Sequence, residues 1–504
     1  MNLATLLDRS AQTYPERPAF VTPDQTLSFQ QLQQQSAALA GGLKAMGIQP
    51  GDRVAVMLPN ILAFPIVVYG LWRMGAQLVT LSPLLKSREV AYMLKDSAAK
   101  ALIVFGPLLA GLQEARVDFP GLVVQVTGQD PAALPFERLF IHPPVLIPEE
   151  VAPDDVVAVL YTSGTTGRPK GAMLTSANLD YDSAAAVEMV EFQPEDRLYC
   201  VLPLFHAYAL NVALLVLPRV GASVFLEPRF VPGTTLKHLV EFHCTIFTGV
   251  PSLFGALLNA GAGVELPHLR LCISGGAPLP VEMLRAFEEK FQAIILEGDG
   301  PTECSPITTF NPPRGVRKTG SVGLPLPGQE IAITDPETDA FLPQGTVGEI
   351  VVRGPNVFKG YLNQPEATAL VLKSGWYHTG DLGYLDEDGY LFMVDRLKDM
   401  ILVGGLNVYS REVEEVLYQH PAVLDGAVVG DFDPLKGELV HAFVQLRPGA
   451  AVTPLQLIAH CRTLLADYKC PRKIDILLDL PRSATGKVLK RVLKEGLKGH
   501  PIDA

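Results

Sequence analysis

The chain has 504 residues, of which 48% are hydrophobic and 19% charged, and its formal net charge is −12. A chain of this length exceeds what one ordinary hydrophobic core supports, so we expect two or more domains. The acidic balance and the lack of a basic stripe argue against nucleic acid as a partner.

The N-terminal stretch and the cysteines bear on the compartment. Residues 1–20 place Asp8 and Arg9 inside an apolar stretch, which indicates an amphipathic helix and not a signal peptide. The most apolar runs, 61–71 and 207–217, are shorter than the roughly 20 residues that a membrane span needs. The six cysteines form no C-x-x-C pair, as is typical of reduced thiols. We therefore expect a cytoplasmic protein without a transmembrane segment.

Helix and strand patterns alternate in the first hundred residues. The pattern predicts helices at 28–47, 63–75 and 89–99 and strands at 52–58, 77–81 and 101–105. This alternation indicates an α/β fold, with parallel sheet covered by helices. Residues 106–152 are proline-rich and weakly patterned, and we interpret them as a link to the next lobe. The alternation resumes at Val156.

A loop of glycines and hydroxyls, YTSGTTGRPKG at 161–171, follows a β-branched run. Because Thr175 or Ser176 can cap a following helix, we place this loop between a strand and a helix. Glycines let the backbone approach an anion closely, and N–H groups and hydroxyls then surround phosphate oxygens. The ending of a Walker loop is missing. The candidate phosphate-binding residues are Thr162, Ser163, Gly164, Thr165, Thr166, Gly167 and Lys170.

Four further segments carry residues that can bind a ligand or take part in a reaction. They are LPLFHAYAL (202–210, with His206), SGGAPLP (274–280), EGDGPTECSP (297–306, with Thr302 and Glu303) and GWYHTGDLG (375–383, with Asp381). The alternative interpretations are a core histidine, plain glycine turns and a solvated turn aspartate. A carboxylate near phosphate oxygens is the usual way in which proteins bind Mg²⁺.

The segment 395–417 marks the expected domain boundary. We expect an N-terminal domain at 1–395 and a small C-terminal α+β domain at 396–504, which reads as helix, strand, strand, helix, strand. Near its end, LPRSATGKVLKRVLK at 480–494 places Lys487 on a glycine-bearing loop before a basic helix. The alternative for Lys487 is an ordinary surface lysine.

In their order and spacing these motifs resemble those of the AMP-forming adenylating enzymes, a superfamily that includes acyl-CoA synthetases, peptide-synthetase adenylation domains and luciferases. The resemblance covers nearly the whole chain and is greatest to bacterial fatty acyl-CoA synthetases. It implies a large N-terminal domain of helix-covered sheets, a small mobile C-terminal domain, and the use of ATP, Mg²⁺ and CoA.

The resemblance also implies a role for each motif. The loop 162–170 holds phosphates, Thr302 reaches phosphate, Glu303 holds Mg²⁺ together with Thr162, and Asp381 binds the ribose. Arg396 lies near the ribose and phosphate, Lys398 is the hinge, Gly404 and Gly405 line the pantetheine route, and Lys487 bridges the acid and the α-phosphate. The residues beside adenine and the acyl group are Gly275, Gly276, Ala277, Gly298, Asp299 and Gly300, and His206 borders the acyl pocket.

The chain departs from the family pattern at four positions. Asp299 stands where an aromatic residue usually stacks on adenine, and Pro301 replaces a common Leu or Met. Ala209 replaces a glycine, and we expect its methyl group to narrow the acyl pocket. Ser410 replaces a proline, and we expect Ser410 to act as the N-cap of the next helix, with Glu412 and Glu414 in its first turn.

We therefore expect an ATP-dependent acyl-CoA synthetase. The resemblance implies that His206 stands where peptide-synthetase domains carry an ammonium-binding aspartate, so we expect amino acids to be excluded. The apolar residues at 207–210 suit an alkyl chain instead, so we expect the enzyme to activate a medium- or long-chain fatty acid. The alternatives are a cinnamate-type aryl acid ligase, a ligase that loads a carrier protein, a luciferase-type enzyme and, in a different class, a non-catalytic nucleotide or acyl sensor. No carrier domain follows Ala504, which favours a diffusible thiol. A weak peripheral membrane contact and a homodimer stay open.

Overall fold

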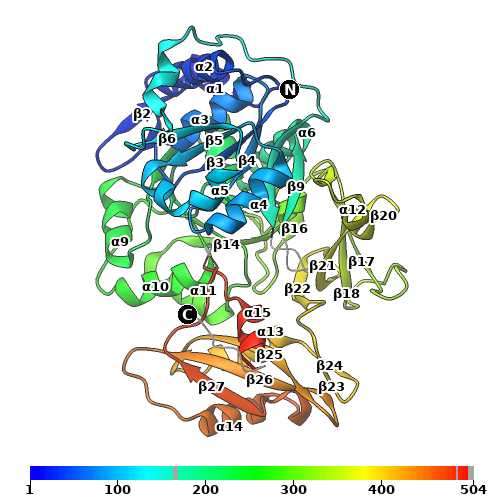
Figure 1. Ribbon diagram of the computed structural model, residues 1–504. Coiled ribbons are helices and arrows are strands. Elements are labelled where there is room, and N and C mark those ends of the chain that lie inside the picture. The colour runs from blue at the N-terminus through cyan, green and yellow to red at the C-terminus, as the bar shows by residue number, and fades with distance from the viewer. Residues whose placement is uncertain (163–168, 484–485, 498–504) are drawn as a thin grey trace.

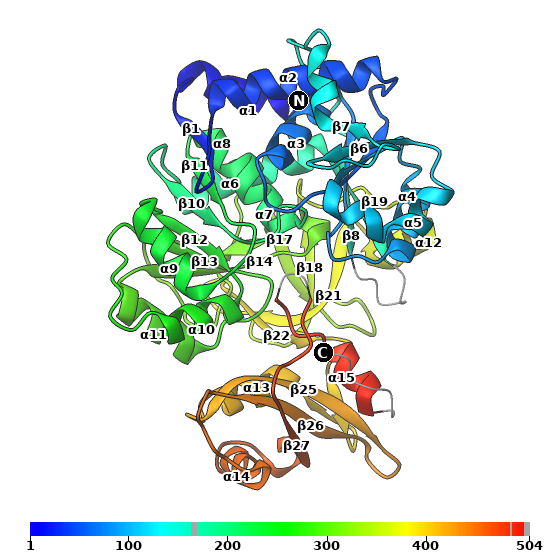
Figure 2. The ribbon, with the colours of Figure 1, turned by 60° about the vertical axis from the view of Figure 1, so that its left-hand side comes forward.

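The computed structural model describes residues 1–162, 169–483 and 486–497. It shows a large N-terminal part that contains three sheets and a smaller C-terminal part that contains one (Figure 1). The smaller part lies below the large one in Figure 2, with the connection between them following β22 (Leu391–Arg396).

The first sheet confirms the predicted alternation of strands and helices. In the described residues it has eight strands in the order β19-β9-β8-β4-β3-β5-β6-β7, and its central strands are parallel. Its strands are β3 (Arg53–Met57), β4 (Gln77–Thr80), β5 (Ala101–Phe105), β6 (Leu122–Val126), β7 (Leu134–Pro135), β8 (Val156–Thr162), β9 (Lys170–Thr175) and β19 (Gly360–Tyr361).

Helices and short 3-10 turns cover this sheet. They are α1 (Ala4–Thr13), α2 (Phe29–Ala45), α3 (Ala63–Arg73), α4 (Ser87–Ser97), η1 (Gly106–Gly111), α5 (Gln113–Val117) and η2 (Phe136–Ile141). The start of α2 is set by a capping box, in which the Ser28 hydroxyl accepts from Gln31 N–H and the Gln31 side chain accepts from Ser28 N–H. The interpretation of 106–152 as a link was wrong, because β6 pairs in parallel with β5 and extends the sheet.

The second sheet also has a parallel centre. Its nine strands in the described residues follow the order β16-β15-β14-β13-β12-β10-β11-β1-β2. They are β1 (Pro18–Val21), β2 (Thr26–Ser28), β10 (Arg197–Cys200), β11 (Ser223–Leu226), β12 (Ile246–Gly249), β13 (Leu271–Ser274), β14 (Ile294–Asp299), β15 (Thr309–Phe310) and β16 (Leu324–Pro325).

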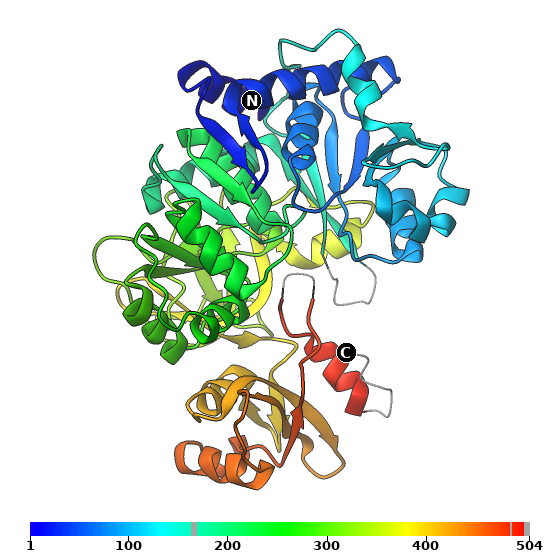
Figure 3. The ribbon, with the colours of Figure 1, turned by 90° about the vertical axis from the view of Figure 1, so that its left-hand side faces the viewer.

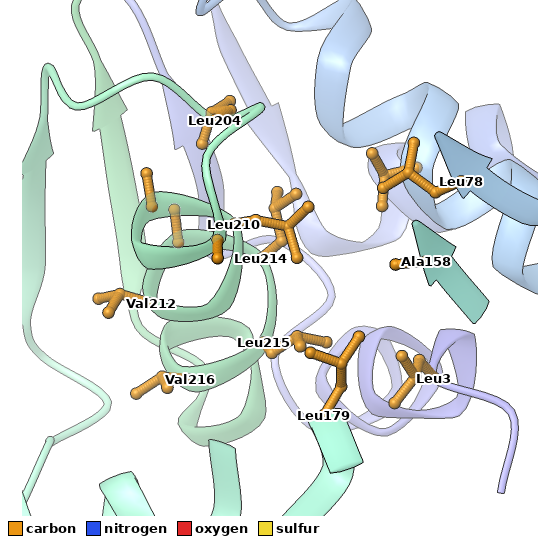
Figure 4. Packing of buried hydrophobic residues seen from close by; sticks show 14 of the residues in the cluster. Leu3, Leu78, Ala158, Leu179, Leu204, Leu210, Val212, Leu214, Leu215 and Val216 are labelled. Carbon is orange, nitrogen blue, oxygen red and sulfur yellow. The ribbon is translucent and has the colours of Figure 1, made fainter. Parts of the chain in front are cut away.

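The helices between residues 176 and 304 accompany the second sheet. They are α6 (Ser176–Val190), α7 (Ala207–Asn211), the π-helix η3 (Val212–Val216), α8 (Leu217–Val220), α9 (Pro232–Glu241), α10 (Pro251–Ala260), α11 (Val281–Phe291) and the 3-10 turn η4 (Thr302–Cys304). The run from α7 to α8 is buried from Ala209 to Pro218. Figure 4 shows Leu210, Leu214 and Leu215 facing Leu179, Leu3 and Leu78, so one hydrophobic core joins this run to the first sheet.

A third sheet completes the large part and carries the Asp381 motif. It consists of β17 (Glu330–Thr334), β18 (Gly348–Arg353), β20 (Leu372–Lys373), β21 (Trp376–Leu385) and β22, with α12 (Pro365–Val371) beside it. All of the segment GWYHTGDLG after Gly375 lies within β21, which pairs with both β18 and β22. Asp381 is therefore a strand residue and not part of a solvated turn.

The C-terminal part has its own sheet and its own cores. It contains β23 (Ile401–Val403), β24 (Leu406–Val408), α13 (Ser410–Tyr418), β25 (Val423–Asp433), β26 (Gly437–Leu446), α14 (Pro454–Leu464), the 3-10 turn η5 (Asp467–Lys469), β27 (Lys473–Leu477) and α15 (Lys490–Leu497). Its buried side chains form two clusters drawn from residues 401–493 alone. A separate core defines a separate, smaller domain.

The expectation for Ser410 was wrong. The N-cap of α13 is Tyr409, which makes no side-chain capping bond, and Ser410 is the first helical residue. The Ser410 N–H, which has no partner within the helix, instead donates to Oδ2 of Asp395 on β22 at 2.5 Å. A carboxylate from another element thus replaces the local cap.

Candidate active site

The glycine and hydroxyl loop joins two antiparallel strands. Thr162 at the end of β8 pairs with Lys170 at the start of β9. The predicted placement between a strand and a helix was wrong, because β9 lies between the loop and α6. Lys170 Nζ lies 5.0 Å from the centre of the Tyr361 ring. The candidate residues Ser163, Gly164, Thr165, Thr166 and Gly167 lie outside the described residues.

Glu303 lies beside Thr162, and hydroxyl oxygens surround its carboxylate. It belongs to η4, directly after Thr302, and its side chain is buried. Its Oε1 accepts hydrogen bonds from the Tyr361 hydroxyl at 2.8 Å and from Thr162 Oγ1 at 3.3 Å. Carboxylate and hydroxyl oxygens are hard donors, so this group fits Mg²⁺. No spacing in the sequence marks Tyr361, which reaches Glu303 because β19 pairs with β9.

A buried polar cluster supports the turn that carries Glu303. Asn211 Nδ2 donates to the backbone carbonyl of Ser305 at 2.6 Å and also to the carboxylate of Asp182. Asp182 further accepts from Ile307 N–H at 3.3 Å, and burial raises the pKa of its carboxyl. Ser305 has a left-handed φ of 72°. These contacts link the helix after His206 to the Thr302–Glu303 turn, and no sequence pattern predicted them.

Two glycine-containing segments meet because their strands are parallel neighbours. Ser274 on β13 pairs with Glu297 on β14, so the residues that follow these two lie at the same edge. Gly275, Gly276 and Ala277 follow β13, whereas Gly298 and Asp299 are the last residues of β14, where they pair with β15, and Gly300 comes directly after them. A methyl group at Gly300 would lie 1.7 Å from the Pro306 carbonyl oxygen, and one at Gly298 would lie 2.4 Å from the Phe310 ring. Close backbone approach therefore requires both glycines.

Asp299 lies among charges of both signs. Loss of water raises the pKa of its carboxyl to about 6, and the negative charge of Asp381 adds to this, while Arg396 and Lys487 oppose it. The Thr308 hydroxyl lies 3.4 Å from Asp299 Oδ2 and 2.8 Å from its carbonyl oxygen. The residue that replaces the family's aromatic is therefore part of an electrostatic cluster.

Asp381 is held against Arg396 by strand pairing. The two residues face each other on β21 and β22, and Arg396 Nε lies 3.1 Å from Asp381 Oδ1. Burial raises the pKa of Asp381, against the lowering effects of Arg396, Lys487 and Lys398. Glu349 braces the same stretch, because its Oε1 accepts from Gly380 N–H at 3.0 Å and its Oε2 lies 2.8 Å from His378 Nδ1. Glu349 was not singled out from the sequence.

His206 forms the N-cap of α7. Its Nδ1 accepts from Tyr208 N–H at 3.4 Å, which leaves the proton of the neutral ring on Nε2. Burial and the positive charge of Lys487 lower the pKa of His206 to about 4, so the ring is neutral near pH 7. The Tyr208 side chain contacts the segment at the end of β13. Its hydroxyl donates to the Ile273 carbonyl at 3.0 Å, and its ring lies against Gly275.

Lys487 reaches this cluster from the small domain. Figure 3 shows the loop before α15 extending from the small domain toward the large one. Its Gly486 lies against Val250 and Ser252 at the start of α10. Burial and the neighbouring charge of Arg396 lower the pKa of Lys487 to about 8, while Asp381, Asp399 and Asp299 act in the opposite direction. Five separate segments of the chain therefore bring together His206, Asp299, Asp381, Arg396 and Lys487.

Three candidates lie outside the cluster. Lys398 is exposed in the connection between β22 and β23. Gly404 and Gly405 form the turn of the β23–β24 hairpin with φ values of 60° and 84°, and Gly404 N–H donates to the Lys436 carbonyl. The left-handed φ values explain the two glycines, but the turn lies on the sheet of the small domain and not beside Lys487.

The fold and this cluster define a two-domain α/β enzyme whose site combines carboxylates with cations at the domain junction. Residues 7–362 match the AMP-binding enzyme family and residues 412–487 match the AMP-binding enzyme C-terminal domain. The chain therefore belongs to the AMP-binding enzyme family. None of the described helices has the length and hydropathy needed to cross a bilayer.

Curated relatives match over nearly the full length. A long-chain-fatty-acid–CoA ligase of Yersinia pestis is 36% identical over 98% of this chain and 94% of its own. A feruloyl-CoA synthase of Amycolatopsis sp is also 36% identical, over 95% and 97%. Among solved structures, ATP-bound MatB from Rhodopseudomonas palustris has a TM-score of 0.91 at 33% identity, covering 99% of each chain. The anthranilate CoA ligase AuaEII with anthranoyl-AMP has a TM-score of 0.93 at 29% identity, covering 99% and 97%.

Proposed function

We propose that the protein is an ATP-dependent acyl-CoA synthetase that activates a medium- or long-chain fatty acid as acyl-AMP and transfers the acyl group to CoA. The observation that carries this proposal is the position of Lys487. A cation from the small domain lies among Asp381, Asp299 and His206 of the large domain, where an acid and a nucleotide phosphate would meet. The full-length similarity to CoA ligases supports the same activity.

Each motif has a role in the first step. The loop from Thr162 to Lys170 binds the β- and γ-phosphates through its N–H groups, hydroxyls and lysine. Asp381 accepts hydrogen bonds from the ribose hydroxyls, with Arg396 beside it, and the segments at 275–277 and 298–300 border adenine and the acyl group. Glu303 and Thr162 would hold Mg²⁺, which when bound neutralises phosphate charge, and Thr302 reaches a phosphate oxygen.

The first step forms a bond between a carboxylate oxygen of the acid and the α-phosphorus of ATP. The bond from that phosphorus to the bridging oxygen breaks, and pyrophosphate leaves with the electron pair. Negative charge collects on the oxygens around the α-phosphorus, and the Lys487 ammonium offsets it. The neutral His206 presents Nε2–H toward the acid without adding charge.

The second step needs the CoA thiol at the acyl carbon. Sulfur forms a bond to that carbon, the thiol proton is released, and AMP leaves. We propose that the small domain, residues 396–504, turns about Lys398 so that Gly404 and Gly405 come beside the acyl-AMP and Lys487 withdraws. This matches a turn with left-handed backbone and open space above both glycines.

The lining of the acyl site favours an alkyl chain. The residues that follow His206 are mainly apolar, namely Ala207, Tyr208, Ala209 and Leu210, and each methylene of an acyl chain buried beside them contributes about 0.8 kcal/mol. His206 offers no carboxylate to an amino acid, and a buried unpaired ammonium costs several kcal/mol. An aryl acid is the second candidate, because the feruloyl-CoA synthase is as similar in sequence as the fatty-acid enzyme.

We also propose a cytoplasmic location, since all six cysteines are buried free thiols. The proposal leaves open whether the protein forms a homodimer and whether it makes a weak peripheral contact with a membrane. It includes no nucleic-acid partner.

Pyrophosphate release tests the function. Matched panels of fatty acids, cinnamates and amino acids at equal concentration should give the highest kcat/KM with fatty acids, and CoA ester should form with the same acids. Highest kcat/KM with cinnamates would favour the second candidate. Highest values with amino acids, or no pyrophosphate with any acid, would contradict the proposal.

A further inference from the structure

The carboxylate of Asp395 is bonded across the proposed domain boundary. Asp395 lies near the end of β22, and Ser410 begins α13 of the small domain. Asp395 Oδ2 accepts from the Ser410 N–H at 2.5 Å, and Oδ1 accepts from the Ser410 hydroxyl at 3.0 Å. Because Lys398 lies between these residues in the chain, the two bonds join one side of the proposed hinge to the other.

Lys490, at the start of α15, contacts the same Ser410 side chain and a carboxylate of α13. Lys490 Nζ donates to Ser410 Oγ at 2.5 Å and pairs with Glu414 Oε1 at 2.8 Å. Burial opposes the charge on Lys490, but the carboxylates of Glu414 and Asp395 raise its pKa overall. Lys490 is the first residue of α15, three positions after Lys487. The contacts of Ser410 therefore bear directly on the loop that carries Lys487.

The next residue of α13 fastens the same junction. Arg411 Nη1 donates to the Met393 carbonyl on β22 at 2.5 Å, and its Nε lies 3.8 Å from Glu415 Oε1 on α13. Figure 2 shows α13 lying directly below β22. Two consecutive residues at the start of α13 thus bind β22. Ser410 binds the carboxylate of Asp395, and Arg411 binds the backbone carbonyl of Met393. Both bonds include a charged group, the Asp395 carboxylate in one and the Arg411 guanidinium in the other, and such bonds are stronger than those between neutral groups.

We propose that Asp395 is a positioning residue for acyl-AMP formation. Acting through Ser410 and Lys490, it holds the small domain in the orientation that places Lys487 beside Asp381 and Asp299. A turn about Lys398 separates β22 from α13 and breaks these bonds, so Asp395 favours the first orientation over the second. This inference rests on the proposed function for its catalytic meaning, but the domain orientation can be measured without catalysis.

Cysteine cross-linking reports the orientation. Arg447 of the small domain donates to Asn259 Oδ1 of α10 at 3.5 Å, and the six native cysteines are buried. A bis-maleimide, whose spacer takes the place of the long arginine side chain, should therefore cross-link Asn259→Cys to Arg447→Cys rapidly in the protein that is otherwise unchanged. Adding Asp395→Ala should slow it by about tenfold, the loss expected for a charged hydrogen bond. Adding Asp395→Asn, which keeps an acceptor, should slow it less. Glu330→Gln, in an exposed pair with Arg353, is the control.

The half-reactions separate positioning from simple destabilisation. Asp395→Ala should slow acyl-AMP formation by about tenfold and leave CoA ester formation from supplied acyl-AMP unchanged or faster. In a Lys487→Ala background it should cause no further loss, because Asp395 acts through the placement of Lys487. An unchanged cross-linking rate, or equal loss in both half-reactions, would overturn the proposal. If the parent protein releases no pyrophosphate with any acid, the proposed function fails, while the cross-linking rate still decides the role of Asp395.

Discussion

Lys487 is a lysine whose surroundings bring its pKa close to the physiological range. Burial and Arg396 lower the pKa to about 8, and three aspartates limit the fall. The cation predominates below that pH and is lost as the pH rises through it. We therefore expect kcat/KM for acyl-AMP formation to fall above about pH 8. Lys487→Arg should remove this descending limb, because arginine stays charged. Pyrophosphate release at low ATP measures it, and a limb that persists in Lys487→Arg would assign the pKa to another group.

Asp299 acts on Lys487 through its charge. The aspartate favours the cationic form of Lys487, and Lys487 in turn favours the ionised form of Asp299. Asp299→Asn keeps the size of the side chain but removes the charge, so the descending limb should move to lower pH. Thr308→Val, which removes the hydroxyl 3.4 Å from Asp299 Oδ2, is the matched control and should leave the limb in place. A limb that does not move in Asp299→Asn would show that the two charges are not coupled.

At the scale of an element, the segment from Gly298 to Pro306 depends on close backbone packing. Gly300→Ala puts a methyl group 1.7 Å from the Pro306 carbonyl oxygen, so the turn that carries Thr302 and Glu303 has to shift. We expect the free energy of unfolding to fall by about 1–3 kcal/mol and the KM for MgATP to rise. Gly233→Ala in α9, where no atom lies within 4 Å of the added methyl, is the control. Chemical denaturation and steady-state kinetics measure both effects, and a wild-type KM would contradict the placement of Glu303.

The elements that could be predicted are those with a strong local pattern. The helix at 28–47 was found because its apolar period is a local pattern, and the buried strands were found from their β-branched runs. The strand β9 was not distinguished from the loop before it, since glycines and hydroxyls carry no period. Tyr361, Glu349 and Asp182 were missed because their contacts with Glu303, Gly380 and Asn211 join residues far apart in the chain.

At the scale of the whole molecule, the two domains keep separate cores and meet through polar contacts. The small domain buries its apolar side chains within residues 401–493, so it can move without exposing a core. What the sequence pattern could not supply is the orientation of this domain. That orientation depends on Asp395 and Ser410, on Arg411 and Met393, and on Gly486 against α10.

Lys398→Pro tests whether this orientation has to change during the reaction. Proline fixes φ near −65° and restricts the residue before it, whereas a hinge has to change its backbone angles. Leu397 N–H is bonded to the Gly380 carbonyl at 2.9 Å and Met400 N–H to the Arg396 carbonyl at 3.0 Å, so the residues around position 398 are already held in the first orientation. Pyrophosphate release should therefore persist while CoA ester formation drops.

Lys398→Ala, which removes the side chain and leaves the backbone free, is the control and should retain both steps. Comparing pyrophosphate release with CoA ester formation from supplied acyl-AMP gives the two rates separately. If Lys398→Pro runs both steps at wild-type rates, the hinge lies elsewhere in the connection between β22 and β23. If it loses both steps equally, the substitution acts on the first orientation itself. A loss confined to the second step means that rotation about the backbone at position 398 moves Lys487 away from the site and brings the Gly404–Gly405 turn beside the acyl-AMP.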